Sequence, residues 1–300
     1  MDWSRAQRIL IGAFLLLNAF LTYQLWGQPW EYGGRLLVST EEQVREIQDQ
    51  LSRSGIRLQV EIPRRVRPRA FLNVTRVMPD PAELEQQFLG GKAAEERVEP
   101  KTGSLTMVGA RGVLVIEPAG VIHYRSAAGQ GAPSTPEALS GVDLSAARSA
   151  AEEFIASHGG MPSDARLDGI TLDKERKLAV VNYFQEYQGT LFFGSHLTVG
   201  LAARQPGGPL QVESYDRLWV EFAGLNRDPK PLLPATSALL RAAGHLESAG
   251  YKEAVVTGIT LGYYSRPYDA DRWVAAPVWR IRLDDGQVLL INAITGELES

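Results

Sequence analysis

The chain has 300 residues, of which 44% are hydrophobic and 22% are charged, and this composition is typical of a folded protein with a sizeable core. Its 31 basic and 35 acidic residues are interspersed and leave a formal net charge of -4, which disfavours a nucleic-acid partner. The absence of cysteine excludes disulfides, thiolate metal ligands and a cysteine nucleophile.

The first predicted element is an apolar helix over residues 9–26, ILIGAFLLLNAFLTYQLW, which carries no charged side chain. Such a helix is about 27 Å long, close to the thickness of a membrane hydrocarbon core. Arg5 and Arg8 precede it, so the positive-inside rule places residues 1–8 in the cytoplasm and the rest of the chain outside. A cleaved signal peptide is the main alternative, although bulky residues stand where cleavage needs small ones. A buried helix of a soluble fold rarely lacks all charge over this length.

One face of this predicted transmembrane helix carries a polar amide among apolar side chains, at spacings that fit contact with a partner helix. A buried amide there stabilises the contact between helices by roughly 1 kcal/mol. Alternatively, the amide is tolerated because the segment is hydrophobic enough. The predicted contact face consists of Ile11, Phe14, Asn18, Thr22 and Leu25.

A juxtamembrane linker over residues 27–38 leads to a first predicted extracytoplasmic α+β domain at 39–128. Ser39 or Thr40 caps an amphipathic helix there, and Gly55 ends it. The further elements expected in this domain are strands at 56–62 and 70–78, a short helix at 82–89, and strands at 104–108, 113–117 and 121–125.

Four arginines in IPRRVRPRAF form the sharpest local charge feature, and the flanking prolines predict an exposed, extended loop. Such a loop fits an acidic partner surface or an anionic envelope polymer. The alternative is a solvated loop that only aids solubility. The residues are Arg64, Arg65, Arg67 and Arg69.

A stretch rich in glycine, proline and serine predicts a linker at 129–142, followed by a second α+β region at 143–300. Two helices are expected in this region, each followed by several strands, and the layout predicts two similar helix-plus-antiparallel-sheet units. Asp284, Asp285 and Gly286 predict the turn of the closing hairpin. The expected helices are 144–157 and 235–249, and the expected strands are 179–187, 191–201, 210–222, 254–264, 277–283 and 287–292.

The sequence carries no recognisable motif for catalysis, a metal or a cofactor. The four histidines His123, His158, His196 and His245 lie in separate predicted elements without metal-ligand spacing. Ser195 lies in FFGSHL, which lacks the nucleophile-elbow pattern and is typical of a strand. We therefore predict a non-enzymatic protein with no catalytic residues, no metal and no cofactor.

Both ends of the chain resemble the YycI (WalI) family of two-component-system regulatory proteins. The opening MDWSRAQRILIGAFLLLNAFL carries the short polar start and the apolar helix with Asn18. The closing PVWRIRLDDGQVLLINAITGELE, from Pro277 to Glu299, is similar to the family's last hairpin and its TGE ending. The hairpin and TGE segment also resemble PepSY-type modules.

The resemblance implies an α+β fold with an N-terminal transmembrane helix and YycH/YycI-like, PepSY-like repeats outside the membrane. It implies a single-pass membrane protein of Gram-positive bacteria, with a YycH-like protein and a WalK-type (YycG) sensor histidine kinase as partners. In the family this kinase controls cell-wall homeostasis, and the transmembrane helices are implicated in kinase contact. The family supplies no catalytic residues.

Two other functions compete with this interpretation. A PepSY-like inhibitory or envelope-ligand-binding module would hold its ligand in a pocket between helix and sheet. A membrane-anchored cell-wall hydrolase would bring titratable groups together in a cleft.

Overall fold

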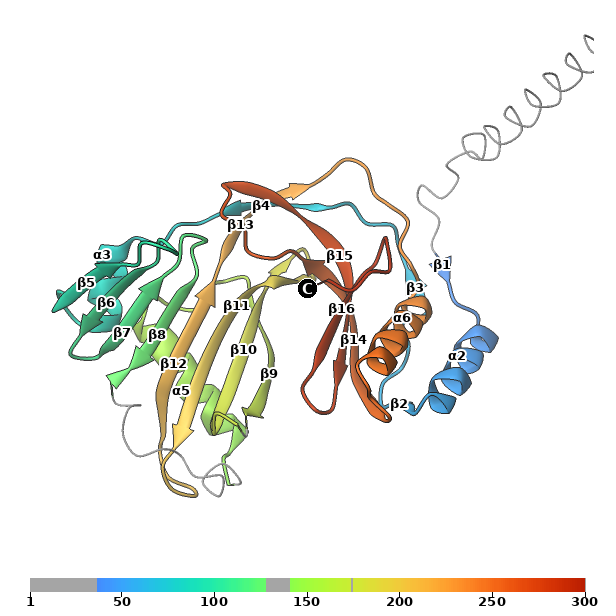
Figure 1. Ribbon diagram of the computed structural model, residues 1–300, viewed down its shortest axis with the longest axis horizontal. Coiled ribbons are helices and arrows are strands. Elements are labelled where there is room, and N and C mark those ends of the chain that lie inside the picture. The colour runs from blue at the N-terminus through green and yellow to red at the C-terminus, as the bar shows by residue number, and fades with distance from the viewer. Residues whose placement is uncertain (1–36, 128–140, 174, 300) are drawn as a thin grey trace, which may run out of the picture.

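The computed structural model describes residues 37–127, 141–173 and 175–299, which form an α+β fold (Figure 1). Within these ranges, 14 strands belong to one sheet, and β1 (Leu37–Val38) pairs separately with β3 (Arg65–Val66). The large sheet extends through two lobes, each with its own helices and its own hydrophobic core.

The first lobe, here called the two-helix lobe, combines the start of the described chain with its end. Helix α2 (Glu41–Arg53) is fixed by a capping box, in which the Thr40 hydroxyl accepts from the Gln43 amide and the Gln43 side chain accepts from the Thr40 amide. It packs beside α6 (Ala235–Ser248). The strands of this lobe are β2 (Ile56–Leu58), β14 (Ala254–Tyr264), β15 (Arg272–Leu283) and β16 (Val288–Asn292).

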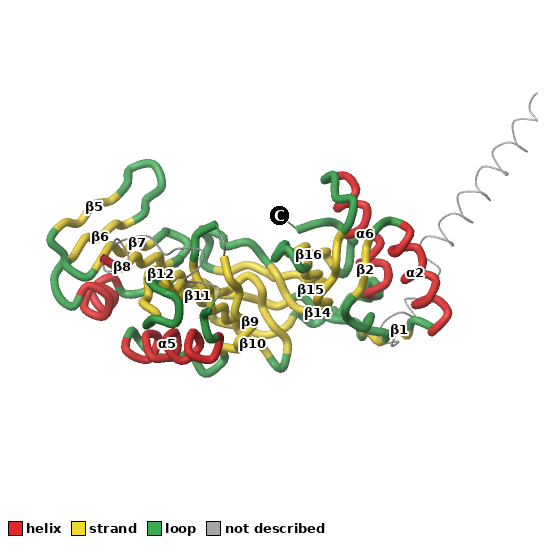
Figure 2. Tube along the Cα trace, turned by 90° about the horizontal axis from the view of Figure 1, so that it is seen from below, coloured by secondary structure: helices red, strands yellow, loops and turns green. Residues whose placement is uncertain are grey.

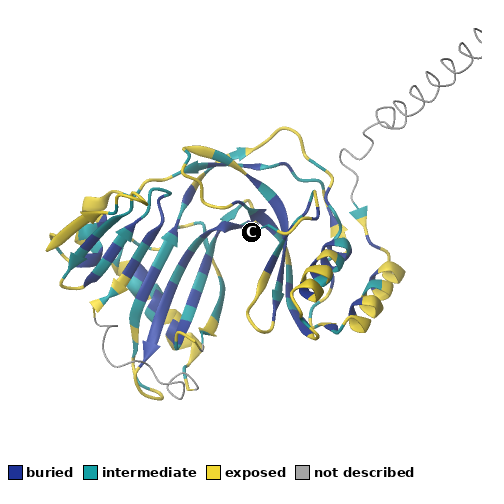
Figure 3. Cartoon of the chain, viewed as in Figure 1, coloured by how far each residue is buried: buried dark blue, intermediate teal, exposed yellow. Residues whose placement is uncertain are grey.

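The core of the two-helix lobe follows from the apolar stripes of its helices. Leu51 of α2 and Leu239 of α6 are 1% exposed and share one cluster with Trp279 of β15. The remaining residues of α2 are mostly charged or polar, and Figure 3 shows that most of the helix is exposed. The helix therefore lies at the edge of the lobe, with one narrow face buried.

The second lobe, here called the eight-strand lobe, is an antiparallel sheet in the order β9-β10-β11-β12-β8-β7-β6-β5. Helix α5 (Leu144–Ser157) covers one face of this sheet (Figure 2), together with α3 (Pro81–Leu84) and the π-helical turn η1 (Glu85–Leu89). The strands are β5 (Glu95–Val98), β6 (Leu105–Gly109), β7 (Gly112–Ile116), β8 (Ile122–Ser126), β9 (Ala165–Asp173), β10 (Leu178–Tyr187), β11 (Thr190–Ala203) and β12 (Leu210–Leu218).

Among the described residues, two regions of strand pairing join the lobes. Phe192 of β11 pairs in parallel with Tyr263 of β14. In addition, β4 (Leu72–Arg76) pairs with the first residues of β15 on one side and with β13 (Val220–Leu225) on the other. A small third core, which includes Leu72, Phe192 and Tyr263, fills the space at this junction.

The structure confirms the predicted helices at 144–157 and 235–249 and the closing hairpin. Gly286 has φ +92°, a conformation that glycine adopts at little cost, and the Leu283 amide donates to the Gln287 carbonyl across the turn. The expected single strand 210–222 is wrong, because the chain breaks at Trp219 and β13 leaves the eight-strand lobe to join β4. The prediction also lacked β1, β3, β5 and β9.

Each large core contains residues from both sides of the predicted linker 129–142. The two-helix lobe joins Val44 and Leu51 to residues 232–293, and the eight-strand lobe joins residues 84–124 to residues 147–215. The division into domains 39–128 and 143–300 stays a prediction, and the cores group the same residues differently. The two predicted helix-plus-sheet units correspond in chain order to α5 followed by β9–β12 and α6 followed by β14–β16.

Candidate functional site

The face of the eight-strand lobe opposite α5 carries a cluster of charged side chains. Strand alternation creates this face, because Tyr124 and Tyr215 enter the core beneath α5 while their neighbours point to the other side. His123 of β8 and Asp216 of β12 are direct cross-strand partners on this open face. Two strands that are distant in sequence thus place an imidazole beside a carboxylate.

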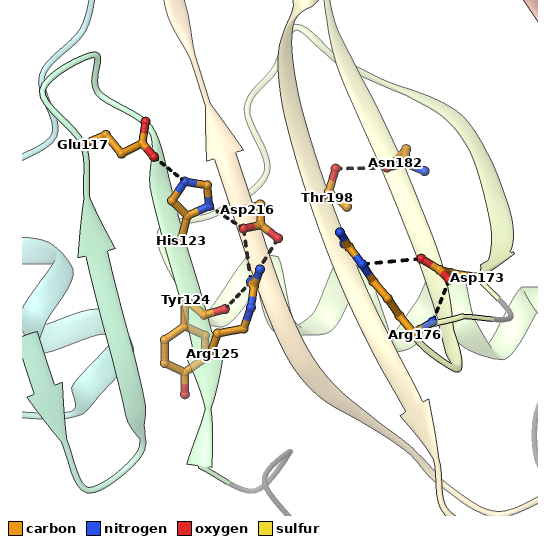
Figure 4. Close-up of polar contacts among 9 residues, drawn as sticks. All are labelled: Glu117, His123, Tyr124, Arg125, Asp173, Arg176, Asn182, Thr198 and Asp216. Atoms are coloured by element: carbon orange, nitrogen blue, oxygen red, sulfur yellow. Dashed lines mark hydrogen bonds and ion pairs between the residues drawn. The ribbon is translucent and has the colours of Figure 1, made fainter. Parts of the chain in front are cut away.

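The cluster, here called the His123 network, contains four side chains (Figure 4). His123 Nδ1 lies 2.6 Å from Asp216 Oδ1, and His123 Nε2 lies 3.1 Å from Glu117 Oε1. Arg125 donates through Nη1 to both Asp216 oxygens at 3.1 Å. The imidazole is 33% exposed and the Asp216 side chain 18% exposed, so the network is half-buried.

The hydrogen bonds set the charge state of this network. The hydrogen bond from His123 to Asp216 raises the pKa of the imidazole above its ordinary value, against burial, which lowers it. Burial raises the pKa of Asp216, but hydrogen bonds from His123 and Arg125 outweigh that effect, so its pKa is lowered. His196, whose pKa is lowered by burial, lies on the adjacent strand β11. His123 is therefore stabilised as an imidazolium.

The geometry of His123 does not suit general-base catalysis. Both ring nitrogens lie within hydrogen-bond distance of carboxylates, and in the imidazolium form both donate, so this form offers no lone pair to a nucleophile. Ser195 is fully buried, where its Oγ donates to the Phe192 carbonyl and accepts from the Gln185 amide, each at 3.1 Å. That hydroxyl satisfies the backbone at a register shift between β10 and β11.

The same face continues with polar residues across β9, β10 and β11. Thr198 donates to the Asn182 side chain at 2.9 Å, and Arg176 pairs with Asp173 at 3.7 Å (Figure 4). The face thus presents hydroxyl, amide and charged groups from five neighbouring strands. Such a surface is suited to polar recognition of a macromolecular partner.

A buried ion pair lies where the two lobes meet. Arg280 of β15 donates to both oxygens of Asp168 of β9, at 2.5 and 2.8 Å, and the two side chains are 10% and 12% exposed. The Arg280 guanidinium also lies 4.9 and 5.1 Å from the ring centroids of Phe184 and Phe193. Charge pairing and two aromatic faces therefore fix the lobes to each other.

A glycine permits the close approach at this junction. A Cβ built on Gly262 of β14 would lie 2.6 Å from the Leu191 carbonyl oxygen and would also meet the Phe193 ring. Arg69 adds a further contact, because it donates to the Thr190 hydroxyl at 2.6 Å and lies over the Tyr263 ring. Arg69 is thus a junction residue.

The other three predicted loop residues remain at the surface. Arg64, Arg65 and Arg67 are exposed, and Val66 between them is buried. The structure therefore separates Arg69 from the exposed part of the arginine cluster.

The predicted helix-contact residues Ile11, Phe14, Asn18, Thr22 and Leu25 lie outside the described residues. Within 37–127, 141–173 and 175–299, no helix is long and apolar enough to cross a membrane. The described residues also hold no group of three or more His, Asp or Glu side chains with metal-binding geometry.

Sequence reasoning missed the His123 network and the junction pair Arg280–Asp168. The alternating pattern places His123 and Asp216 on polar faces of their strands, and this signal is readable. Nothing local shows that β8 lies beside β12, or that β9 and β15 bring their charged groups together.

Taken together, these features define an α+β protein in which two helix-on-sheet units follow one another along the chain. The family model described as YycI protein matches residues 148–294, a range that begins within α5 and ends after β16. This match assigns residues 148–294 to the YycI family, whose members are regulatory proteins of the WalK/WalR two-component system.

The fold also resembles a crystal structure of an uncharacterized protein from Eubacterium rectale ATCC 33656. That similarity has a TM-score of 0.51 at 10% identity and covers 88% of this chain and 99% of the other. No curated protein matches this chain. The crystal structure supports the fold and says nothing of function.

Proposed function

We propose that the protein is a non-enzymatic, membrane-anchored regulator that acts with a YycH-like partner on a WalK-type sensor histidine kinase controlling cell-wall homeostasis. The observation that carries this proposal is the YycI family match over both helix-on-sheet units. The charge-free residues 9–26 supply the single-pass anchor, with residues 1–8 in the cytoplasm and the described part outside.

A regulator of this kind shifts a kinase only when it binds two signalling states with different affinity. A difference of about 1.4 kcal/mol changes the ratio of the two states tenfold. Two contacts supply this difference in our proposal. The Asn18 face meets the kinase helices, and the open face around the His123 network meets a partner outside the membrane.

The lobe junction couples these two contacts. The anchor joins the two-helix lobe at β1, whereas the open polar face belongs to the eight-strand lobe. Because the Arg280–Asp168 pair fixes one lobe to the other, binding at the polar face constrains the orientation of the anchor.

Co-purification in detergent tests the proposal. The full-length protein is expected to recover a histidine kinase and a YycH-like protein, and a chain lacking residues 1–30 is expected to lose most of the kinase. Asn18→Leu should weaken kinase recovery by about fivefold, the effect of roughly 1 kcal/mol at a helix contact. Leu16→Ile, on the opposite face of the predicted helix, serves as the matched apolar control. Equal kinase recovery with and without residues 1–30 would falsify the transmembrane contact.

A further inference from the structure

The exposed arginines of the loop around β3 lie beside the point where the described chain begins. Leu37 of β1 is the cross-strand partner of Val66, and Val38 is the partner of Arg65. The Ser39 amide donates to the Arg64 carbonyl at 2.8 Å and extends this pairing. The backbone therefore holds Arg65 and Arg67 next to the residues that follow the predicted anchor.

The backbone of the loop is set up to present two guanidinium groups together. Pro63 and Pro68 favour extended backbone on either side of β3. In an extended strand, residues two apart lie on one side at about 7 Å spacing, so Arg65 and Arg67 share a side while Val66 is buried. A cavity of 350 Å³ lies against them, lined by Arg65, Val66, Arg67, Arg69 and Leu261.

These guanidinium groups have no anionic partner among the described residues. Arg69 bonds to Thr190, whereas Arg65 and Arg67 form no ion pair with any carboxylate in the part of the chain that the structure describes. Arg64 lines a groove together with Glu41 and Glu61. Arg65 and Arg67 are thus the residues available to an external anion.

The short separation between the predicted anchor and β1 indicates which anion the arginines meet. Residues 27–36 separate the end of the apolar segment from Leu37, and ten extended residues span at most about 35 Å. A group tethered this closely faces the membrane surface at a high effective concentration. Guanidinium matches phosphate oxygens in a bidentate geometry, and anionic headgroups provide these oxygens at high density.

We propose that Arg65 and Arg67 bind the phosphate groups of anionic lipid headgroups at the membrane surface from which the chain emerges. The contact orients the two-helix lobe on the bilayer. It thereby sets the orientation of the polar face of the eight-strand lobe relative to the membrane. This inference rests on the proposed membrane anchor.

The chain lacks cysteine, so Val38→Cys gives a single labelling site beside the arginines, at a side chain that is 54% exposed. The labelled full-length protein is placed in nanodiscs that contain a lipid with a spin-labelled headgroup, which quenches a nearby fluorophore. Quenching is expected to be stronger with phosphatidylglycerol than with phosphatidylcholine alone. Arg65→Gln and Arg67→Gln should each reduce the contact equilibrium roughly fivefold, and salt should reduce it in the unmodified protein.

The double variant Arg97→Gln/Arg176→Gln is the matched control, because it removes two exposed charges in the eight-strand lobe. Its quenching should equal that of the unmodified protein. Equal quenching in both lipids, or an equal loss in the control, overturns the proposal. Release by inorganic phosphate at constant ionic strength overturns the lipid assignment in favour of a phosphate-ion site. If the protein does not remain in nanodiscs made of phosphatidylcholine alone, the proposed membrane anchor is wrong. This outcome does not depend on the arginines.

Discussion

Two carboxylate–cation clusters in this protein differ in their surroundings. At the lobe junction, Arg280 and Asp168 are almost fully buried, and two phenylalanine rings flank the guanidinium. On the open face, His123 and Asp216 are partly exposed and share their charges with Glu117 and Arg125. The first cluster joins two lobes and the second joins two neighbouring strands.

Burial decides what each cluster contributes. A buried ion pair adds little to the stability of the fold compared with an apolar pair in the same place. The loss of one partner, however, leaves a desolvated charge that is strongly destabilising. A half-exposed pair is screened by water and salt, so its removal costs little stability. If the pair contains a histidine, its charge changes with pH in the physiological range. The junction pair therefore specifies how the lobes meet, and the His123 network responds to the medium.

The largest effect should come from breaking the junction pair. Arg280→Met leaves Asp168 buried with only Arg282, 3.6 Å away, and should lower the free energy of unfolding by about 3 kcal/mol. Urea denaturation of the full-length protein in detergent measures this loss. The double variant Arg280→Met/Asp168→Leu should recover most of the stability, because no buried charge remains.

Arg176→Met is the matched control for the junction variant. It breaks the exposed pair with Asp173, whose side chains are 75% and 30% exposed, and should cost less than about 0.5 kcal/mol. Equal losses for Arg176→Met and Arg280→Met would contradict the distinction between the two clusters.

A smaller effect is expected from crowding the junction without changing any charge. Gly262→Ala forces the new methyl group against Phe193 and the Leu191 carbonyl and should destabilise the protein by about 1–3 kcal/mol. Gly244→Ala in α6 meets nothing within 4 Å and should stabilise the protein by roughly 0.5–1 kcal/mol, because alanine favours the helix. Thermal unfolding of both variants tests the opposite signs.

The smallest effect should be the pH dependence contributed by the His123 network. The pKa of His123 is raised in the folded state, so its stabilisation is fully present below about pH 6.5 and is lost as the pH rises through the folded-state pKa. The pKa of Asp216 is lowered, so its stabilisation is present above about pH 3.8 and is lost as the pH falls below that value. The network should therefore contribute most between these two limits.

His123→Gln removes the titrating group and keeps a hydrogen-bond donor for Asp216. Between pH 5.5 and pH 8.5, the free energy of unfolding of the unmodified protein should fall by about 1 kcal/mol or less relative to that of the variant. The effect is small because the imidazole is a third exposed. Urea denaturation at both pH values gives the comparison. An identical pH profile for the two proteins would show that folding does not shift the pKa of His123.

The sequence predicted elements whose signals are local. The cap at Thr40, the apolar stripe of Val44 and Leu51, and the Asp284–Gly286 turn each lie within a short stretch, and the structure has the helix and the hairpin there. The short strand β5 was missed because Glu95, Glu96 and Arg97 show no alternation of buried and exposed residues. The break at Trp219 was missed because the strand pattern continues through it.

Contacts between distant strands were not predictable from such local signals. His123 and Asp216 are 93 residues apart, and Asp168 and Arg280 are 112 residues apart. Their pairing depends on which strands are neighbours in the sheet, and many strand orders satisfy the same alternating pattern. The arginine loop was predictable as a charged segment, but the role of Arg69 at the junction depends on β11 and β14.

The packing of α2 against α6 has a consequence for how the protein folds after synthesis. Leu51 shares its core with Leu239 and Trp279, so the first helix has no complete core until nearly the whole chain is available. Such distant contacts slow folding, because a long loop must close before they form. In the membrane topology that we propose, this delay benefits export, because the two-helix lobe completes its core only after the last strands have crossed the membrane.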